Sequence, residues 1–249
     1  MLLPCKTIVR FGCLFGVILL CLPPLNQAED KPSFSGEEVT YTRKARALKG
    51  YLSKPAGPGP FPAVIYNHGG LGDRIGGCPK ETSEALAKAS YVGFSPLRRQ
   101  TISMQGHMED VLDALEYVKG LDYVDKDRIA MMGFSRGGHL TFIAGAAQKD
   151  LKAIVIMACA PGMGDREQFL LHAKEISAPV LLMVSENDQA QADHVALMKQ
   201  IKNSLEKENK QVEFILYPPY KNDGHRMFFE ISSYWKAVLK VLNTNLNKQ

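Results

Sequence analysis

The order of apolar segments along this chain constrains its fold more than any other feature of the sequence. Short apolar runs rich in β-branched residues alternate with longer segments in which apolar residues recur every three or four positions. Continuous apolar runs predict parallel strands covered on both faces, and the periodic segments predict helices packed against them. The predicted core strands are residues 63–66, 91–95, 128–134, 153–157, 180–184 and 212–217. We therefore expect an α/β fold, with a mostly parallel central sheet, helices on both faces and an outer strand at residues 47–55.

The first 28 residues have the layout of a secretory signal peptide. Two basic residues precede an apolar run at residues 11–22, which is followed by two prolines and a small residue, Ala28. The run is shorter than the roughly 20 residues that a helix needs to cross a bilayer. We predict cleavage near Ala28, export to the periplasm or the medium, and one folded domain at residues 29–249, with no stable membrane insertion after cleavage. A lipoprotein anchored through Cys21 and a cytoplasmic protein are the alternatives.

Charge and cysteine content say little about partners. The formal net charge is +4, and Lys6 and Arg10 of the leader carry part of it. The remaining charge is too small to predict nucleic acid or an anionic membrane as a partner. Cys78 and Cys159 lie beyond the leader. They could form a disulfide in an exported protein, or each could be buried as a small apolar residue.

The segment Gly133-Phe134-Ser135-Arg136-Gly137 fits the pattern G-x-S-x-G and lies where a predicted strand meets a predicted helix. In so tight a turn the glycines remove Cβ atoms that would collide, and the serine adopts a strained conformation that lifts its hydroxyl above the sheet. The hydroxyl also lies at a helix N-terminus, where unpaired N–H groups favour negative charge. Ser135 is the predicted nucleophile, although these five residues alone would also fit a turn with an N-capping serine.

A serine hydroxyl needs a base to take its proton and a carboxylate to orient that base. In folds of this kind both partners follow the serine in the chain, in loops at the carboxyl ends of later strands. Asp188 follows the strand at residues 180–184, and His225 follows the strand at residues 212–217. These two residues complete the predicted triad, with Glu186 as the alternative acid.

The other histidines are weaker candidates for the base. His139 lies within the helix after the serine, and His107, His172 and His194 lie in or beside predicted helices, where we expect them to face solvent. His68 follows the strand at residues 63–66 and is expected to brace its loop. No paired spacing such as H-x-x-x-H or C-x-x-C occurs, so the sequence predicts no metal and no cofactor.

The segment Asn67-His68-Gly69-Gly70-Leu71-Gly72 predicts an oxyanion hole. An acyl-transfer enzyme needs hydrogen-bond donors aimed at the oxygen that becomes negative, each worth about 3 to 4 kcal/mol. Glycines at the end of a strand let the backbone turn its N–H groups toward the active site. We expect the N–H of Gly70 or Leu71, together with that of Arg136, to form the hole.

These motifs resemble those of the α/β-hydrolase superfamily, and within it the compact dienelactone hydrolase-like and prolyl oligopeptidase-related hydrolases. The resemblance covers nearly the whole chain after the leader. It is carried by Tyr66-Asn67-His68-Gly69-Gly70, Gly93-Phe94-Ser95-Pro96 with Arg98 and Arg99, Tyr123-Val124-Asp125, Asp127-Arg128-Ile129, residues 133–138, Glu186-Asn187-Asp188 and Gly224-His225. The resemblance implies the same triad of Ser135, Asp188 and His225.

Two departures limit what the resemblance implies. Dienelactone hydrolases use a cysteine where this chain has Ser135, so lactone specificity does not follow. Prolyl oligopeptidases carry a large propeller domain, for which this chain has no room. A minimal catalytic domain remains, with residues 163–174 as a possible small cap.

We expect an exported serine hydrolase that cleaves small carboxylic esters through an acyl-enzyme on Ser135, with His225 as general base and acid and Asp188 orienting it. A serine peptidase or amidase and a thioesterase are the alternatives within this chemistry. A non-catalytic binding module is the alternative outside it, since a fold does not determine a function.

Arg98 and Arg99 are candidates for substrate binding. They follow the strand at residues 91–95 at the sheet edge where such folds bind ligands, and a guanidinium can hold a carboxylate through two parallel hydrogen bonds. The alternative is that these arginines pair with a structural acid or lie in solvent. Without a large lid, the pocket is expected to favour short acyl chains.

Overall fold

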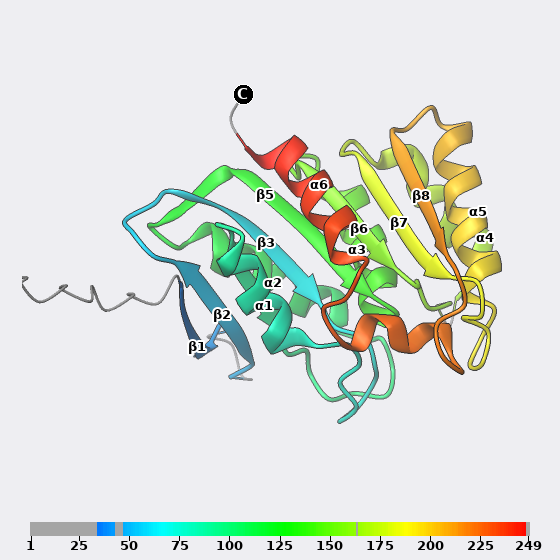
Figure 1. Ribbon diagram of the computed structural model, residues 1–249, viewed down its shortest axis with the longest axis horizontal. Helices are drawn as coiled ribbons and strands as arrows, with labels where there is room; N and C mark the ends of the chain where they lie inside the picture. The colour runs from blue at the N-terminus through cyan, green and yellow to red at the C-terminus, as the bar shows by residue number, and fades with distance from the viewer. Residues whose placement is uncertain (1–33, 43–46, 163, 248–249) are drawn as a thin grey trace, which may run out of the picture. The chain divides into compact units, whose positions relative to one another are not determined.

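The computed structural model describes residues 34–42, 47–162 and 164–247 (Figure 1). Residues Pro32–Gln249 form one compact unit. The predicted leader at residues 1–28 lies outside the described residues. Within the described ranges, no helix is both long enough and apolar enough to cross a bilayer.

An eight-stranded sheet forms the centre of the described part of the chain, in the order β1-β2-β4-β3-β5-β6-β7-β8. The pairs β1/β2 and β2/β4 are antiparallel, and every later pair is parallel. The strands are β1 (Phe34–Thr40), β2 (Lys49–Pro55), β3 (Phe61–Asn67), β4 (Val92–Pro96), β5 (Val124–Phe134), β6 (Ala153–Met157), β7 (Val180–Ser185) and β8 (Val212–Tyr217). The parallel strands bring their carboxyl ends to one edge of the sheet.

Helices cover both faces of this sheet. They are α1 (Pro79–Lys88), α2 (His107–Lys119), α3 (Arg136–Ala147), α4 (Arg166–Leu171), α5 (His194–Lys207) and α6 (Trp235–Leu246), with the 3-10 helices η1 (His172–Glu175) and η2 (Gly224–Phe229). The connections through α1 and through α3 run in opposite directions along the sheet, and right-handed crossovers therefore place these two helices on opposite faces. Helix α6 lies on the face opposite α3, in front of the strands in Figure 1.

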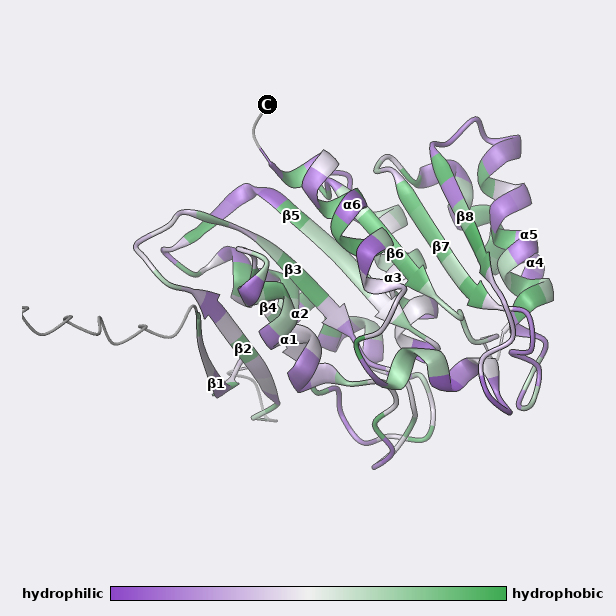
Figure 2. Cartoon of the chain, in the orientation of Figure 1, coloured by the Kyte–Doolittle hydropathy of each residue, from purple (hydrophilic) through white to green (hydrophobic). Residues whose placement is uncertain are grey.

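The strands differ in burial as their sequences differ in polarity. Every residue of β4, β6 and β7 is buried, whereas β1 is mostly exposed. Figure 2 shows the same contrast, with apolar residues along β6 and β7 and polar residues along β1. The continuous apolar runs are therefore the sheet's covered centre, as predicted.

The predicted fold class is confirmed, with differences at the edge of the sheet. Strand β1 and helix α1 were not predicted, and β5 begins at Val124 rather than at Arg128. Residues 125–128 of β5 are only partly buried or exposed, so they lack the apolar run that marks the rest of the strand. A polar strand at the edge of a sheet gives no such run either.

Candidate active site

Ser135 lies at the turn between β5 and α3, in the conformation that the motif predicts. Its φ is 54° and its ψ is −115°, a strained conformation for a residue with a side chain. The surrounding backbone is too close for larger neighbours: a Cβ on Gly133 would lie 2.3 Å from the carbonyl oxygen of Gly137, and one on Gly137 would lie 1.9 Å from that of Asn67. Hydrogen bonds from the Ser135 N–H to the Met157 carbonyl and from the Ala160 N–H to the Ser135 carbonyl hold the turn.

Asp188 and His225 lie together at the same edge of the sheet. Nδ1 of His225 is 3.0 Å from both carboxylate oxygens of Asp188, and both side chains are buried. Since a carboxylate only accepts, Nδ1 carries the proton and Nε2 is left as the basic nitrogen. The ring of His225 also packs on Phe134, the residue before the serine, with 4.6 Å between ring centroids.

Ser135 and His225 line the same pocket. Among the described residues, no hydrogen bond joins the Ser135 hydroxyl to the His225 ring. Such catalytic contacts commonly tighten only when substrate binds.

Asn187 joins the loops that carry the acid and the histidine. Its side-chain oxygen accepts hydrogen bonds from the Ser185 hydroxyl and the Tyr220 N–H, and its amide nitrogen donates to the Lys221 carbonyl. A Cβ on Gly224 would lie 2.7 Å from the Asp188 nitrogen, so the two loops are in close contact. Glu186, the alternative acid, is exposed, and among the described residues the carboxylate bound to His225 is that of Asp188.

The glycine-rich loop after β3, which is the predicted oxyanion hole, is closed by a backbone bridge. Gly69 and Gly76 exchange backbone hydrogen bonds of 2.9 and 3.1 Å, and between them Gly70 has a φ of 81°. The N–H groups of Gly70 and Leu71 make no hydrogen bond within the described chain. Both residues line the pocket beside Arg136, whose N–H opens helix α3 and so has no partner within the helix.

His68 braces this loop, as predicted. Its Nδ1 contacts the Gly69 carbonyl at 2.6 Å, and its Nε2 accepts from the Arg98 N–H at 3.3 Å. These contacts assign the proton to Nδ1. Burial and the nearby Arg98 charge lower the pKa of His68 to about 3, so the ring is neutral near pH 7.

The pocket that Ser135 and His225 share has a volume of about 710 Å³. Three of its lining residues are exposed apolar side chains, Ile75, Ile102 and Phe229, with exposed fractions of 43%, 82% and 44%. A hydrogen bond from the Gly72 N–H to the Thr101 carbonyl joins the loops that carry the two isoleucines. The mouth of the pocket is therefore apolar on this side.

The structure does not place Arg98 or Arg99 in the wall of this pocket. The guanidinium of Arg99 binds both carboxylate oxygens of Asp110 and also contacts Glu109, which is the structural pairing that the sequence left open. Arg98 is buried, and none of its guanidinium nitrogens has a hydrogen-bond partner among the described residues. Burial lowers the pKa of Arg98 to about 10.

The expectation that the remaining histidines face solvent is wrong for His107 and His194. Both are buried, and His172 is half-buried. His194 begins helix α5, lines the pocket, and lies with its Nδ1 2.9 Å from a carboxylate oxygen of Asp188. Its spacing in the sequence, six residues after Asp188, gave no signal of this contact.

Asp188, His194 and His225 are also the described residues whose side chains could surround a metal ion, with ligand atoms within 4.8 Å of one another. The Nδ1 atoms of both histidines, however, already face the carboxylate at hydrogen-bond distances. The three side chains therefore form an electrostatic cluster, with one carboxylate between two imidazole rings. Burial acts to raise the pKa of Asp188, but the contacts with the two rings outweigh it and lower that pKa overall.

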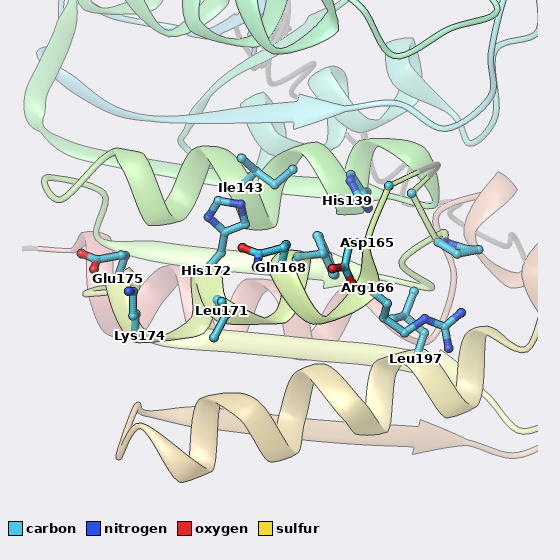
Figure 3. A pocket seen from close by; sticks show the side chains of 14 residues that line it. His139, Ile143, Asp165, Arg166, Gln168, Leu171, His172, Lys174, Glu175 and Leu197 are labelled. Carbon is cyan, nitrogen blue, oxygen red and sulfur yellow. The ribbon is translucent and has the colours of Figure 1, made fainter.

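A second cavity of about 500 Å³ lies between α3 and the predicted cap, which forms α4 and η1 (Figure 3). His139 lies toward one end of it, and Lys174 and Glu175 lie at the other. The ring of His139 stacks on Phe169 with 4.3 Å between centroids, and burial lowers its pKa to about 4. The described residues that line this cavity include no serine or cysteine.

Cys78 and Cys159 are both buried as free thiols, so they are not bonded to each other. Burial raises the pKa of both thiols. Of the two roles considered from the sequence, a disulfide or a buried small apolar residue, both cysteines therefore have the second.

Taken together, the mostly parallel sheet, the strained serine turn and the loops after β7 and β8 define an α/β-hydrolase fold. Residues 48–237 match the model of the dienelactone hydrolase family. The chain belongs to that family, a family of hydrolases with esterases among its structural neighbours.

Individual relatives agree with this assignment. A provisionally named carboxymethylenebutenolidase of Methylorubrum extorquens is 24% identical over 86% of this chain and 81% of its own length. The acylaminoacyl peptidase of Pyrococcus horikoshii superposes with a TM-score of 0.70 at 18% identity, covering 87% of this chain and 42% of that one. An inhibited esterase B of Lactobacillus rhamnosis gives 0.67 at 14% identity, covering 86% and 87%. At these identities the two structures are evidence of the fold alone.

Proposed function

We propose that this protein is a serine hydrolase that cleaves small, uncharged carboxylic esters at Ser135. The observation that carries the proposal is the strained serine at the wall of a pocket that also holds His225, with Asp188 on the far side of the histidine ring. Esterase and dienelactone hydrolase names among the relatives support ester chemistry.

The proposed reaction has two halves. The Ser135 hydroxyl attacks the ester carbonyl while Nε2 of His225 takes its proton, and the carbonyl oxygen becomes negative against the N–H groups of Gly70 or Leu71 and Arg136. As the intermediate collapses, the histidine returns the proton to the departing alcohol. Water then attacks the acyl-serine by the same route, which releases the acid and restores the hydroxyl.

The pocket's walls support an uncharged substrate. Its exposed apolar residues are Ile75, Ile102 and Phe229, and its charged residues Asp73 and Arg74 are adjacent and opposite in sign. One guanidinium nitrogen of Arg136 donates a hydrogen bond to the Pro161 carbonyl at 3.1 Å. An alkyl or aryl group of the substrate therefore gains burial against these apolar side chains.

A panel of substrates tests the proposal. Purified full-length protein should hydrolyse neutral p-nitrophenyl and alkyl esters faster than matched thioesters or peptide amides, and the Ser135→Ala variant should lose this activity by at least about 10⁴-fold while remaining folded. Faster cleavage of amides would favour the peptidase alternative, and faster cleavage of thioesters the thioesterase alternative. Equal activity in wild type and variant would refute the assignment of Ser135.

We also propose that residues 1–28 direct export and are removed. The basic start, the apolar run and the small residue at Ala28 support this. N-terminal sequencing of the protein recovered from its native host should begin just after Ala28, and an intact Met1 on the native protein would overturn the proposal.

A further inference from the structure

His194 lies against the proposed catalytic pair in a way that the usual three-residue arrangement does not require. Its Nδ1 is 2.9 Å from Oδ1 of Asp188, while Nδ1 of His225 is 3.0 Å from Oδ1 and from Oδ2. The imidazole rings of the two histidines pack together with 4.4 Å between centroids and 31° between planes. The Asp188 carboxylate therefore contacts both histidine rings.

The position of His194 is fixed by the backbone around it. It is the first residue of α5, whose N-cap Asp193 accepts a hydrogen bond from the Ala196 N–H, and its own N–H lies 3.3 Å from the Asp188 carbonyl. The chain thus leaves Asp188, turns, and returns to it at His194. A side chain held in this way on a helix is well placed to hold a neighbour in place.

The chemistry of the contact with Asp188 indicates which ring nitrogen of His194 is protonated. A carboxylate offers only acceptors, and it is buried at 0% exposure, so a bare ring nitrogen 2.9 Å away would be repelled. Nδ1 of His194 therefore carries a proton, on the side of the ring nearest Asp188. The N–H direction is bent away from ideal hydrogen-bond geometry, so the attraction is largely electrostatic.

This arrangement divides the negative charge of Asp188 between two rings. A carboxylate that interacts with His225 alone stabilises the protonated form of that ring more than one that also interacts with a second N–H. Two protonated rings in contact would repel each other, so His225 can accept the serine proton only beside a neutral His194.

Other charged groups surround the pair. Asp223 caps η2 and accepts a hydrogen bond from the His225 N–H, and Asp193 caps α5. Arg136 at the start of α3 and the adjacent Asp73 and Arg74 in the loop after β3 line the same pocket. Asp193 and Asp223 bind backbone N–H groups, and Arg136 donates to a backbone carbonyl. Among the described residues, only Asp188 approaches the side chains of both rings within ion-pair distance.

We propose that His194 is a positioning residue of this active site, which holds the Asp188 carboxylate against His225 and sets the pH at which activity appears. The proposal rests on the proposed serine hydrolase function. It gives the buried His194 a role in the turnover rate rather than in substrate binding.

Two substitutions test this proposal. His194→Leu removes the N–H at similar volume, and His194→Gln restores an amide donor. For hydrolysis of a neutral ester, the leucine variant should lose about 10- to 100-fold in kcat with KM changed less than about threefold. The acidic limb of its kcat/KM profile should move to higher pH by about half a unit or more, because the whole charge of Asp188 then acts on His225. The glutamine variant should recover most of kcat and return the limb toward the wild-type position.

The outcomes distinguish the proposed role of His194 from the proposed serine hydrolase function on which it rests. Wild-type protein without esterase activity would count against the proposed function, whereas an active wild type with an unchanged His194→Leu profile would refute the role of His194 alone. A rise in KM at constant kcat would also refute it, by making His194 a substrate contact. Should the leucine variant fail to fold, a 15N-resolved spectrum of the wild-type imidazoles decides. Protonated Nδ1 on both His194 and His225 supports the proposal, and an unprotonated Nδ1 on His194 overturns it.

Discussion

His68 shows how a single buried side chain links loop geometry to the pH dependence of stability. Its pKa in the folded chain is lowered to about 3, from 6.5, so between these pH values the unfolded chain binds a proton that the folded chain does not. The free energy of unfolding must therefore fall as the pH falls through this window, by about 1.4 kcal/mol per pH unit from this residue.

The predicted consequence is a flatter pH profile in His68→Gln. Glutamine offers an amide donor and an amide acceptor in place of the two ring nitrogens, but it does not titrate. Urea unfolding between pH 6.5 and 4.5 should give a slope smaller than that of the wild type by about 1.4 kcal/mol per pH unit. Equal slopes would show that His68 is not held neutral in the folded chain.

Gly70 offers a second test at the residue scale. A Cβ there would lie 2.0 Å from the Arg74 carbonyl oxygen, and the φ of 81° disfavours any side chain. Gly70→Ala should displace the proposed oxyanion donors and lower kcat by about 10²-fold or more. Gly164→Ala is the matched control, because nothing lies within 4 Å of a Cβ at that position. Equal kcat in both variants would show that the loop after β3 does not contribute to the hole.

At the scale of elements, Arg99 and Asp110 tie the loop after β4 to helix α2. The side chain of Asp110 is 1% exposed and accepts hydrogen bonds from the Arg99 guanidinium at 2.6 to 3.0 Å. Arg99→Ala leaves this buried carboxylate without its cationic partner, with the N–H of residue 99 as a remaining donor, and should lower the free energy of unfolding by about 3 kcal/mol.

The same variant separates a structural role from substrate binding. Arg99→Ala should change kcat/KM for an anionic and a neutral ester by the same factor, as measured on the folded fraction. A selective rise in KM for the anionic ester, with an unchanged melting temperature, would instead restore the carboxylate-binding role that the sequence suggested.

Elements whose apolar residues form one continuous or periodic set could be predicted from the sequence. The runs of β6 and β7 are such cases, because both faces of these strands are covered. The polar strand β1 could not, since its pairing with β2 lies in backbone hydrogen bonds that leave no pattern in side chains.

Some residues of the candidate site could likewise be predicted from the sequence, and others could not. Ser135, Asp188 and His225 could be placed by their order and by the strands they follow. His194 could not, because its contact with Asp188 depends on how the loop between them turns back. The sequence left open that Arg99 pairs with a structural acid, but it could not name Asp110, since that contact depends on where α2 packs beside the end of β4.

At the scale of the whole molecule, loops from distant parts of the sequence build one pocket at the carboxyl edge of the sheet. Its apolar mouth combines Ile75, Ile102 and Phe229 from three separate segments. Of these, Ile102 is 82% exposed, so it contributes little to folding and is available to bury a substrate chain.

Ile102→Ser should therefore affect long substrates selectively. We expect kcat/KM for a p-nitrophenyl hexanoate to fall about fivefold to tenfold, equivalent to about 1 kcal/mol of lost burial, with little change for the acetate or in melting temperature. Leu171→Ser is the control, because Leu171 is also exposed but lines the second cavity. Identical chain-length profiles in both variants and wild type would argue against an apolar substrate at this mouth.

The central claim is that Ser135 is an activated nucleophile, and covalent labelling tests it most directly. Full-length protein treated with a fluorophosphonate probe should carry one adduct, which peptide mass spectrometry should locate on Ser135, and Ser135→Ala should carry none. The account predicts that labelling weakens strongly in His225→Ala, because the hydroxyl then lacks its base. An unlabelled wild-type protein, or an adduct that persists in Ser135→Ala, would contradict it.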